Sequence, residues 1–316
     1  NNVAVYWGQG ASQARLSESC QSDDVDIINL SFVNGFPDNS PGGWPATNFG
    51  NACGEEMYSN NGVKTELRSN CPQIGPDIKT CQAAGKKVLL SIGGGSPTNY
   101  YINNATSAKD FAEFLWGAFG PQTDEWVAAG LPRPFGDSSI DGFDFDIESL
   151  MPDPPFADYE SRGYADLINY LKDYCFPAGP NEYYISAAPQ CIVPDSHLSD
   201  ALEHSWIDFV FVQFYNTALC SARTGLTDMA AFTYNAWSDH PSRNPNVRYY
   251  IGLPASTEAI FTDKSYYLSP AEAFTIASDY YTDDKFGGIM LWESTYSKRN
   301  QICGKEYAYY MKDALI

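Results

Sequence analysis

Basic residues, histidines and long apolar runs are all scarce in this sequence of 316 residues. Lysine and arginine together number 19 against 39 acidic residues, which leaves a formal charge of −20. Because so acidic a surface repels phosphate backbones and acidic membranes, we expect no nucleic-acid partner and no membrane partner. No apolar run approaches the roughly 18 residues that a membrane-spanning helix needs. A neutral substrate is compatible with this charge.

Metal-binding sequence patterns are also missing. None of the eight cysteines belongs to a CxxC pair, so the usual spacing of zinc sites is absent. An even number of cysteines in an acidic, lysine-poor chain predicts disulfides and an oxidising compartment, although counting does not fix the pairing. We therefore expect a secreted, extracellular protein, read here as the mature form after removal of a signal peptide.

The sequence also contains two possible glycosylation patterns and three histidines. Asn104-Ala-Thr is a possible glycosylation acceptor, whereas Asn29-Leu-Ser lies in an apolar run and is expected to be buried. The three histidines, His197, His204 and His240, form no catalytic set, and we expect them at surface or capping positions.

Short runs rich in β-branched and aromatic residues recur along the chain, usually with helix-like stretches between them. Several are almost continuously apolar, as is typical of parallel strands covered on both faces. The alternation predicts an α/β fold, a single (β/α)8 TIM barrel over residues 1–316, with elaborated loops on its C-terminal face and no second module. The eight expected strands are Val3–Trp7, Asp26–Val33, Lys87–Ile92, Ser139–Asp146, Tyr183–Ala187, Asp208–Phe214, Tyr249–Leu253 and Gly288–Trp292.

Four further segments have a recognisable pattern. Asn34–Asn70 is rich in Gly, Asn, Pro and Ser, and we expect an elaborated loop there after the second strand. Met151–Phe156 contains three prolines and is expected to be a similar loop after the fourth strand. Apolar residues at helical spacing predict helices within Asp158–Tyr174 and Ala271–Tyr281.

The fourth expected strand carries a row of acidic side chains. Strand side chains alternate between two faces, so Asp144, Asp146 and Glu148 share one face, while the large apolar residues between them share the other. Carboxyl groups that point into a barrel are desolvated and repel one another, so some of them should hold protons above their ordinary pKa. A general acid needs this property, and Glu148 lies at the C-terminal end of the strand, where barrel enzymes react.

Two other interpretations of this row remain open. It could be the solvated face of an open sheet, or Asp-x-Asp-x-Glu could supply oxygen ligands to a divalent metal. Gly93-Gly94-Gly95 lacks the Lys and Ser/Thr that follow in a phosphate-binding loop, so no such loop accompanies the acids.

The segment Asp141–Glu148 resembles the DGxDxDxE signature of family 18 chitinases, and Ser91-Ile92-Gly93-Gly94 resembles the SxGG signature of the same family. Further stretches resemble the class III, hevamine-like branch of plants and fungi, so the likeness extends over nearly the whole chain. These stretches are Tyr6-Trp7-Gly8-Gln9, Ala187-Ala188-Pro189-Gln190-Cys191, Val212-Gln213-Phe214-Tyr215-Asn216, Gly252-Leu253-Pro254-Ala255 and Gly288-Ile289-Met290-Leu291-Trp292.

The resemblance implies a retaining, endo-acting enzyme that cleaves the β-1,4 links of chitin and chitooligosaccharides without a metal or cofactor. Glu148 would protonate the leaving oxygen, and the acetamide of the substrate would attack the anomeric carbon to give an oxazolinium ion. Asp146 would orient this acetamide, Asp144 would share a proton with Asp146, and Tyr215 would hydrogen-bond the acetamide oxygen.

Other residues are assigned to the sugar-binding site or its support. Trp292 could form the floor beneath the sugar that is cleaved, or it could be a packing residue of the barrel. Tyr6, Phe32, Gln213 and Asn216 end other strands and could contact sugar or belong to the core. Ser91 is expected to support the acids, and Gly94 to permit a close backbone approach. Asp141 lies an odd number of residues from the other acids, so it should face the opposite side of the strand and make structural hydrogen bonds.

The resemblance also suggests the disulfides Cys20–Cys81, Cys53–Cys71 and Cys191–Cys220, and it leaves Cys175 and Cys303 without a counterpart. We expect a monomer. Two alternative functions remain open: a non-catalytic chitin-binding lectin or inhibitor on the same fold, and an endo-β-N-acetylglucosaminidase that acts on N-glycans.

Overall fold

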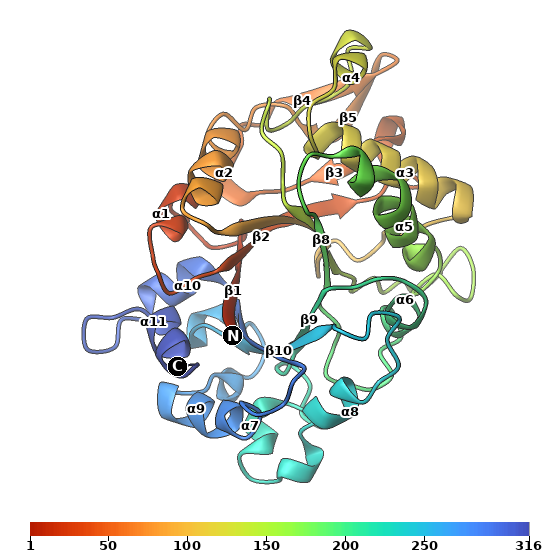
Figure 1. Cartoon of the computed structure of the whole chain (residues 1–316). Helices are drawn as coiled ribbons and strands as arrows, with labels where there is room; N and C mark the ends of the chain where they lie inside the picture. The colour runs from red at the N-terminus through yellow and green to blue at the C-terminus, as the bar shows by residue number, and fades with distance from the viewer. Residues whose placement is uncertain (316) are drawn as a thin grey trace.

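Eight parallel strands close into a barrel in the computed structural model, which describes residues 1–315 (Figure 1). Around the barrel the order is β1-β11-β10-β9-β8-β7-β6-β2, and pairing of β1 with β2 closes the ring. The predicted (β/α)8 barrel is therefore confirmed. Its strands are β1 Asn2–Trp7, β2 Ile27–Gly35, β6 Lys87–Gly93, β7 Gly142–Asp146, β8 Tyr184–Ala187, β9 Phe209–Gln213, β10 Arg248–Pro254 and β11 Phe286–Trp292.

Helices form the outer layer of the molecule (Figure 1). Local sequence sets their starts: Asn104 caps α3 by accepting from two backbone N–H groups, and Ser269 with Glu272 forms a capping box at α9. None of the helices described within residues 1–315 is both long and apolar enough to cross a membrane. They are α1 Leu16–Cys20, α2 Ile74–Ala83, α3 Ala105–Phe119, α4 Asp124–Ala128, α5 Tyr164–Tyr170, α6 Ser199–His204, α7 Ala222–Gly225, α8 Tyr234–Ser238, α9 Pro270–Ser278, α10 Ser294–Arg299 and α11 Tyr307–Asp313.

Two expected elements have later starts in the structure. The fourth strand begins at Gly142 and not at Ser139, because the N–H of Ile140 donates to the carbonyl of Phe119 at the end of α3 and not to a neighbouring strand. The expected helix Asp158–Tyr174 begins only at Tyr164, directly after Gly163 with its left-handed φ of 84°, and it continues into a π-helical turn.

The elaborated loop expected over Asn34–Asn70 contains regular secondary structure. This segment contains β3 Ala46–Thr47, which pairs antiparallel with β2, and a hairpin of β4 Met57–Asn60 with β5 Val63–Arg68. Asn61 and Gly62 join the hairpin strands with φ values of 49° and 80°, as two-residue turns with positive φ require. Asn-Gly is a typical sequence of a hairpin turn, but the loop-like composition of the segment led us to expect no strands on either side of it.

The barrel separates two apolar cores. The larger core lies between the sheet and the helices and includes Phe143, Phe145 and Ile147 from the outward face of β7. A smaller cluster fills the inside of the barrel and includes Tyr6, Phe32 and Tyr215. The expected alternation along β7 is thus confirmed. Asn29 is fully buried, as predicted.

Disulfides join all three expected cysteine pairs, Cys20–Cys81, Cys53–Cys71 and Cys191–Cys220. Cys53–Cys71 brackets the β4–β5 hairpin, and Cys191–Cys220 joins the loop after β8 to the loop after β9. Within residues 1–315, Cys175 is a buried free thiol and Cys303 an exposed one.

Replacing both cysteines of Cys191–Cys220 with serine should lower the free energy of unfolding by roughly 3 kcal/mol, because the bond closes a long loop in the unfolded chain. The two cysteines are 29 positions apart. Denaturant titration under non-reducing conditions measures the change, and Cys303→Ser, which removes an exposed free thiol, should leave stability unchanged. An unchanged free energy in the double variant would contradict the prediction.

Candidate active site

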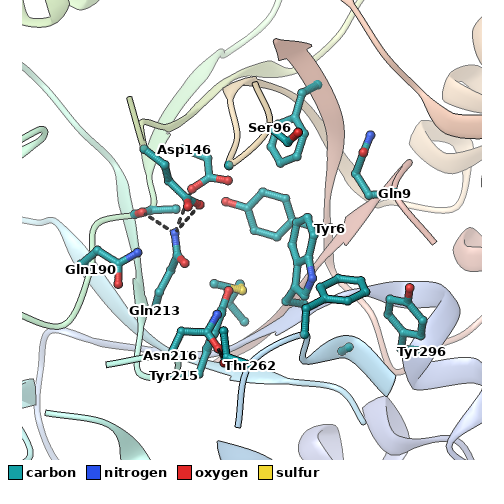
Figure 2. A pocket seen from close by; sticks show the side chains of 18 residues that line it. Tyr6, Gln9, Ser96, Asp146, Gln190, Gln213, Tyr215, Asn216, Thr262 and Tyr296 are labelled. Atoms are coloured by element: carbon teal, nitrogen blue, oxygen red, sulfur yellow. Dashed lines mark hydrogen bonds between the residues drawn. The ribbon is translucent and has the colours of Figure 1, made fainter. Parts of the chain in front are cut away.

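A cavity of about 580 Å³ opens where the C-terminal ends of the barrel strands meet. Residues from many different strand ends and loops line it, which is the arrangement expected of a site on this face of a barrel. The predicted residues that line it are Tyr6, Phe32, Asp146, Glu148, Gln213, Tyr215, Asn216 and Trp292. Figure 2 shows Tyr6, Asp146 and Gln213 projecting into the same part of the cavity.

Asp144 lies beneath the cavity and is fully buried. Its Oδ2 accepts hydrogen bonds from the Tyr6 hydroxyl at 2.8 Å and the Ser91 hydroxyl at 2.6 Å. Its Oδ1 accepts from the Ser186 hydroxyl at 2.6 Å. Burial raises the pKa of Asp144, and these three donors oppose the rise because they stabilise the carboxylate. Ser91, which we expected to support the acidic row, is thus in direct contact with it.

Asp146, one step further along the inward face of β7, has fewer donors. The amide Nε2 of Gln213 donates to its Oδ1 at 2.9 Å, and the same Nε2 lies 3.3 Å from Oε1 of Glu148 (Figure 2). Burial, followed by the negative charges of Glu148 and Asp144, raises the pKa of Asp146 well above its ordinary value. Hydroxyl donors thus stabilise the carboxylate form of Asp144, whereas burial and the neighbouring negative charges favour the protonated form of Asp146.

Glu148 is partly exposed and lines the open cavity. Its backbone N–H donates to the hydroxyl of Tyr100 at 2.7 Å, and that hydroxyl donates to the carbonyl of Gly94 at 2.7 Å. A side chain at Gly95 would place its Cβ 3.0 Å from Oε2 of Glu148, so glycine leaves room for the carboxyl. These contacts fix the end of β7 while its last carboxyl faces the cavity.

Aromatic rings form another wall. Trp292 lies with its ring centroid 5.5 Å from that of Tyr6, and 6.0 Å from that of Phe32, to which it is nearly parallel. Tyr215 lines the cavity with a buried hydroxyl-bearing ring, and its pKa is raised by burial and then by the charge of Asp146. Apolar faces and a few hydroxyl and carboxyl groups therefore meet in one cavity, as in sites for sugars.

Two predicted residues act from outside the cavity. Gly94 does not line it: with φ of 88°, it donates its N–H to the Asp146 carbonyl at 2.7 Å and leaves space for Phe32. Asp141 points away from the barrel interior and accepts from the Val88 N–H at 2.8 Å and from Gln82 Nε2 at 3.1 Å. Asp141 thus holds together a backbone and a side-chain donor outside the cavity.

Several cavity residues were not predicted from the sequence. Tyr100 is fully buried and holds the backbone of Glu148, although nothing in its sequence context marks it. Gln9 and Gln190 lay within the stretches that resemble the family, and this was the one signal that could have identified them. The unpredicted residues on the cavity wall include Gln9, Ser96, Gln190, Phe261, Thr262 and Tyr296.

The hydrogen bonds of the acidic row do not fit a metal site. Asp144 directs both oxygens to hydroxyl donors, and Asp146 accepts from an amide nitrogen. Hydroxyl and amide hydrogens occupy the lone pairs that a divalent cation would need. Among residues 1–315 no group of three or more His, Cys, Asp or Glu side chains is arranged to hold a metal ion.

His197 does not have the surface position that we expected. Its side chain is only 14% exposed, and its Nε2 lies 2.8 Å from the carbonyl oxygen of Ser149. His197 thus connects the loop after β8 to the loop after β7. His204 is exposed as predicted, whereas the side chain of His240 is 9% exposed.

Glu293, directly after Trp292, is a buried carboxyl outside the acidic row. Its Oε1 accepts from the backbone N–H of Tyr296 at 3.2 Å, which caps α10, and its Oε2 has no hydrogen-bond partner. Burial raises the pKa of Glu293 to about 7. Folding therefore favours the protonated form of this carboxyl over its carboxylate form.

Comparisons with known proteins identify the family and agree with the barrel fold. The model of glycosyl hydrolases family 18 matches residues 2–267. The chain is 48% identical to Endochitinase A1 from Aspergillus fumigatus along 100% of its own length, and it spans 37% of that protein. ICChI chitinase from Ipomoea carnea superposes with a TM-score of 0.76 at 29% identity, covering 99% of this chain and 100% of that one. XAIP-II from Scadoxus multiflorus, a xylanase and α-amylase inhibitor protein, gives 0.73 at 30% identity, covering 96% and 98%.

The titration of Glu293 makes a prediction about stability. Its pKa rises from 4.5 in the unfolded chain to about 7 in the folded one, so the folded state binds more protons between these values. Stability from this group is therefore lost as pH rises from about 4.5 to 7. Glutamine does not titrate, so Glu293→Gln loses no stability in this way. Its free energy of unfolding should therefore rise relative to that of the parent by roughly 3 kcal/mol between pH 4.5 and pH 7.

Denaturant titrations at several pH values measure this difference between Glu293→Gln and the parent. Glu66→Gln, at an exposed position on β5, serves as the control and should follow the parent at every pH. If Glu293→Gln also follows the parent, the buried carboxyl does not titrate as described.

Proposed function

The chain belongs to glycosyl hydrolases family 18, and we propose that it is an endo-acting chitinase that hydrolyses β-1,4 links between N-acetylglucosamine units with retention of configuration. The observation that carries the proposal is the row of carboxyls that runs along β7 and continues to Glu148, two residues after the strand, which faces a cavity of about 580 Å³. The 48% identity to a relative named an endochitinase supports the same activity, although the chain spans 37% of that protein.

Glu148 is the acid and base of the proposed reaction. It donates a proton to the glycosidic oxygen while the carbonyl oxygen of the substrate acetamide attacks the anomeric carbon, and the bond to the leaving sugar breaks. The product of this step is an oxazolinium ion. Water then attacks the anomeric carbon, and Glu148 takes its proton, so that two inversions give net retention. Partial exposure of Glu148 to the cavity supports both roles.

Asp146 and Asp144 stabilise the positive charge that develops on the acetamide nitrogen. Asp146 holds the shared proton before substrate binds and accepts a hydrogen bond from the acetamide N–H during attack. The proton then moves to Asp144, whose hydroxyl partners Tyr6, Ser91 and Ser186 reorient to accommodate it. Tyr215 donates to the acetamide oxygen, and its place on the cavity wall supports this role.

Trp292 is the proposed floor beneath the sugar that reacts. Its ring lines the cavity, and contacts with Tyr6 and Phe32 hold it in place. Gln213 and Asn216 supply polar groups on the same wall. Sugar rings present C–H faces that pack on such aromatic surfaces.

A binding protein on the same fold is the second candidate, because a neighbour at 30% identity is a xylanase and α-amylase inhibitor protein. Likeness of fold alone therefore does not separate an enzyme from an inhibitor. The complete row of Asp144, Asp146 and Glu148 together with Tyr215 supports the enzyme. Action on N-glycans is the third candidate, since the acetamide mechanism applies there equally.

The three disulfides support a secreted, extracellular location. We keep chitin or chitooligosaccharide as the substrate and a monomeric state as parts of the same proposal.

Incubation with N-acetylglucosamine oligomers of defined length tests the proposal. The parent should release shorter oligomers whose first-formed anomer is β, as NMR of fresh product would record, because retention follows from two inversions. Glu148→Gln should lose at least about 100-fold in kcat while it still folds and binds oligomer, since it lacks only the proton. Near-normal turnover by Glu148→Gln would remove Glu148 from its role, and release from N-glycans but not from chitooligosaccharides would favour the third candidate.

Trp292→Ala should weaken the binding of chitotetraose by about 10-fold or more, because the stacking surface under one sugar is lost. Calorimetry in the Glu148→Gln background measures this affinity without turnover. Trp206→Ala, which removes a tryptophan outside the cavity, serves as the control and should bind normally. Unchanged affinity of Trp292→Ala would identify Trp292 as a packing residue.

A further inference from the structure

The three most exposed large apolar side chains of residues 1–315 lie in loops on the face of the barrel that holds the cavity. Phe261 is 86% exposed, Leu219 79% and Leu150 71%. They follow β10, β9 and β7, and Ile192, which is 49% exposed, follows β8. Four successive loops of the barrel therefore each present one apolar side chain to solvent. We call Leu150, Ile192, Leu219 and Phe261 the apolar rim.

Position along the chain places the apolar rim beside the cavity. Leu150 comes two residues after Glu148, and Leu219 three residues after Asn216, and both of these neighbours line the cavity. Ile192 comes two residues after the lining residue Gln190, and Phe261 lines the cavity itself. The apolar rim thus continues outward from the wall of the cavity.

Side-chain contacts join these loops to one another. Thr98 Oγ1 donates to the Leu150 carbonyl at 3.1 Å, while the Leu150 N–H donates to the Thr98 carbonyl at 2.8 Å. His197 connects the loops after β7 and β8 through the Ser149 carbonyl at 2.8 Å.

The loops after β8 and β9 are joined by the disulfide Cys191–Cys220. Thr262 Oγ1 donates to Oδ1 of Asn216 at 2.8 Å and so joins the loops after β9 and β10 (Figure 2). A loop that is free to move can turn an apolar side chain inward, whereas these linked loops keep theirs in solvent.

Apolar side chains that surround a site indicate an interaction surface, whereas single scattered ones do not. A partner of the apolar rim must not be repelled by a protein of charge −20, and it must offer an apolar surface to the uncharged rim. A neutral solid built of sugar rings offers such a surface, because the C–H faces of its chains are flat and apolar. The cavity holds one chain of this solid, and neighbouring chains lie at its margin.

We propose that the apolar rim binds the surface of insoluble chitin beside the chain that occupies the cavity. The inference rests on the proposed function, because it takes chitin as the substrate. It goes further by assigning Leu150, Ile192 and Leu219 to the capture of the solid and not to the cleavage of a single chain.

Adsorption to insoluble chitin tests the proposal in the Glu148→Gln background, where nothing is cleaved. Adding Leu150→Ser and Leu219→Ser should lower the adsorption constant by at least about fivefold, because two apolar contacts are lost. Phe261 is left intact since it lines the cavity. A matched control adds Val127→Ser and Phe274→Ser, which are 48% and 51% exposed on α4 and α9, and should adsorb like its parent.

The same two substitutions are also measured with Glu148 present and soluble chitotetraose as substrate. There kcat/KM should stay within about twofold of the parent, which shows that the fold and the cavity are intact. Adsorption of the parent should not weaken in about 1 M NaCl, because an apolar contact is not screened.

Adsorption unchanged by the rim substitutions would overturn the proposal and leave the apolar rim to a protein partner. An equal loss on chitotetraose would also overturn it, because the rim would then belong to the cavity. Failure of the parent to cleave chitotetraose while it still adsorbs through the rim would instead overturn the proposed activity alone.

Discussion

Asp144 lies inside the barrel with both carboxyl oxygens hydrogen-bonded to hydroxyl groups from β1, β6 and β8. A carboxyl in an apolar interior is costly unless donors of this kind surround it. Tyr6, Ser91 and Ser186 must therefore all point inward toward Asp144, and Ser91 and Ser186 are its register partners on β6 and β8, the two strands that pair with β7. Because strand side chains alternate, the same register sets Asp146 and then Glu148 at successive levels toward the cavity. A register shift of β7 by one residue would turn the acidic row outward, into the apolar core between the sheet and the helices.

The position of Glu148 depends equally on the loops that surround it. Tyr100 and Gly94 hold its backbone, Gly95 leaves space for its carboxyl, and Gln213 links it to Asp146. These contacts come from the loop after β6 and from β9, so the site is assembled from strands far apart in sequence. The links between successive loops extend this rigidity from β6 to β10 and hold exposed apolar side chains where they cannot collapse.

The sequence predicted those features of the structure that repeat regularly along the chain, such as the alternation of side chains along a strand. Alternation along β7 separates acids from Phe143, Phe145 and Ile147, and the structure buries the two sets on opposite sides of the strand. Contacts made by loops have no period, so Ser96, Thr262 and the role of His197 were not predicted. The hairpin after β2 was missed because the polar composition of the segment outweighed its Asn61-Gly62 turn. The burial of Glu293 was not predicted, since it depends on segments far away in sequence, such as that of Gly10, where a side chain would place its Cβ 2.5 Å from Oε1 of Glu293.

The proposed substrate accounts for the separate roles of apolar and acidic groups. A neutral sugar polymer offers no charge to an acidic protein, so in the proposed function binding relies on Trp292, Phe32 and Tyr6 in the cavity and on the apolar rim outside it. In the proposed reaction, positive charge develops only when the acetamide closes on the anomeric carbon. Asp146 and Asp144 would then interact with that charge more strongly than with the bound substrate, and such a difference is what lowers a barrier. Until that step, protonation within the buried acidic row limits the repulsion between its carboxyl groups, which would otherwise destabilise the barrel.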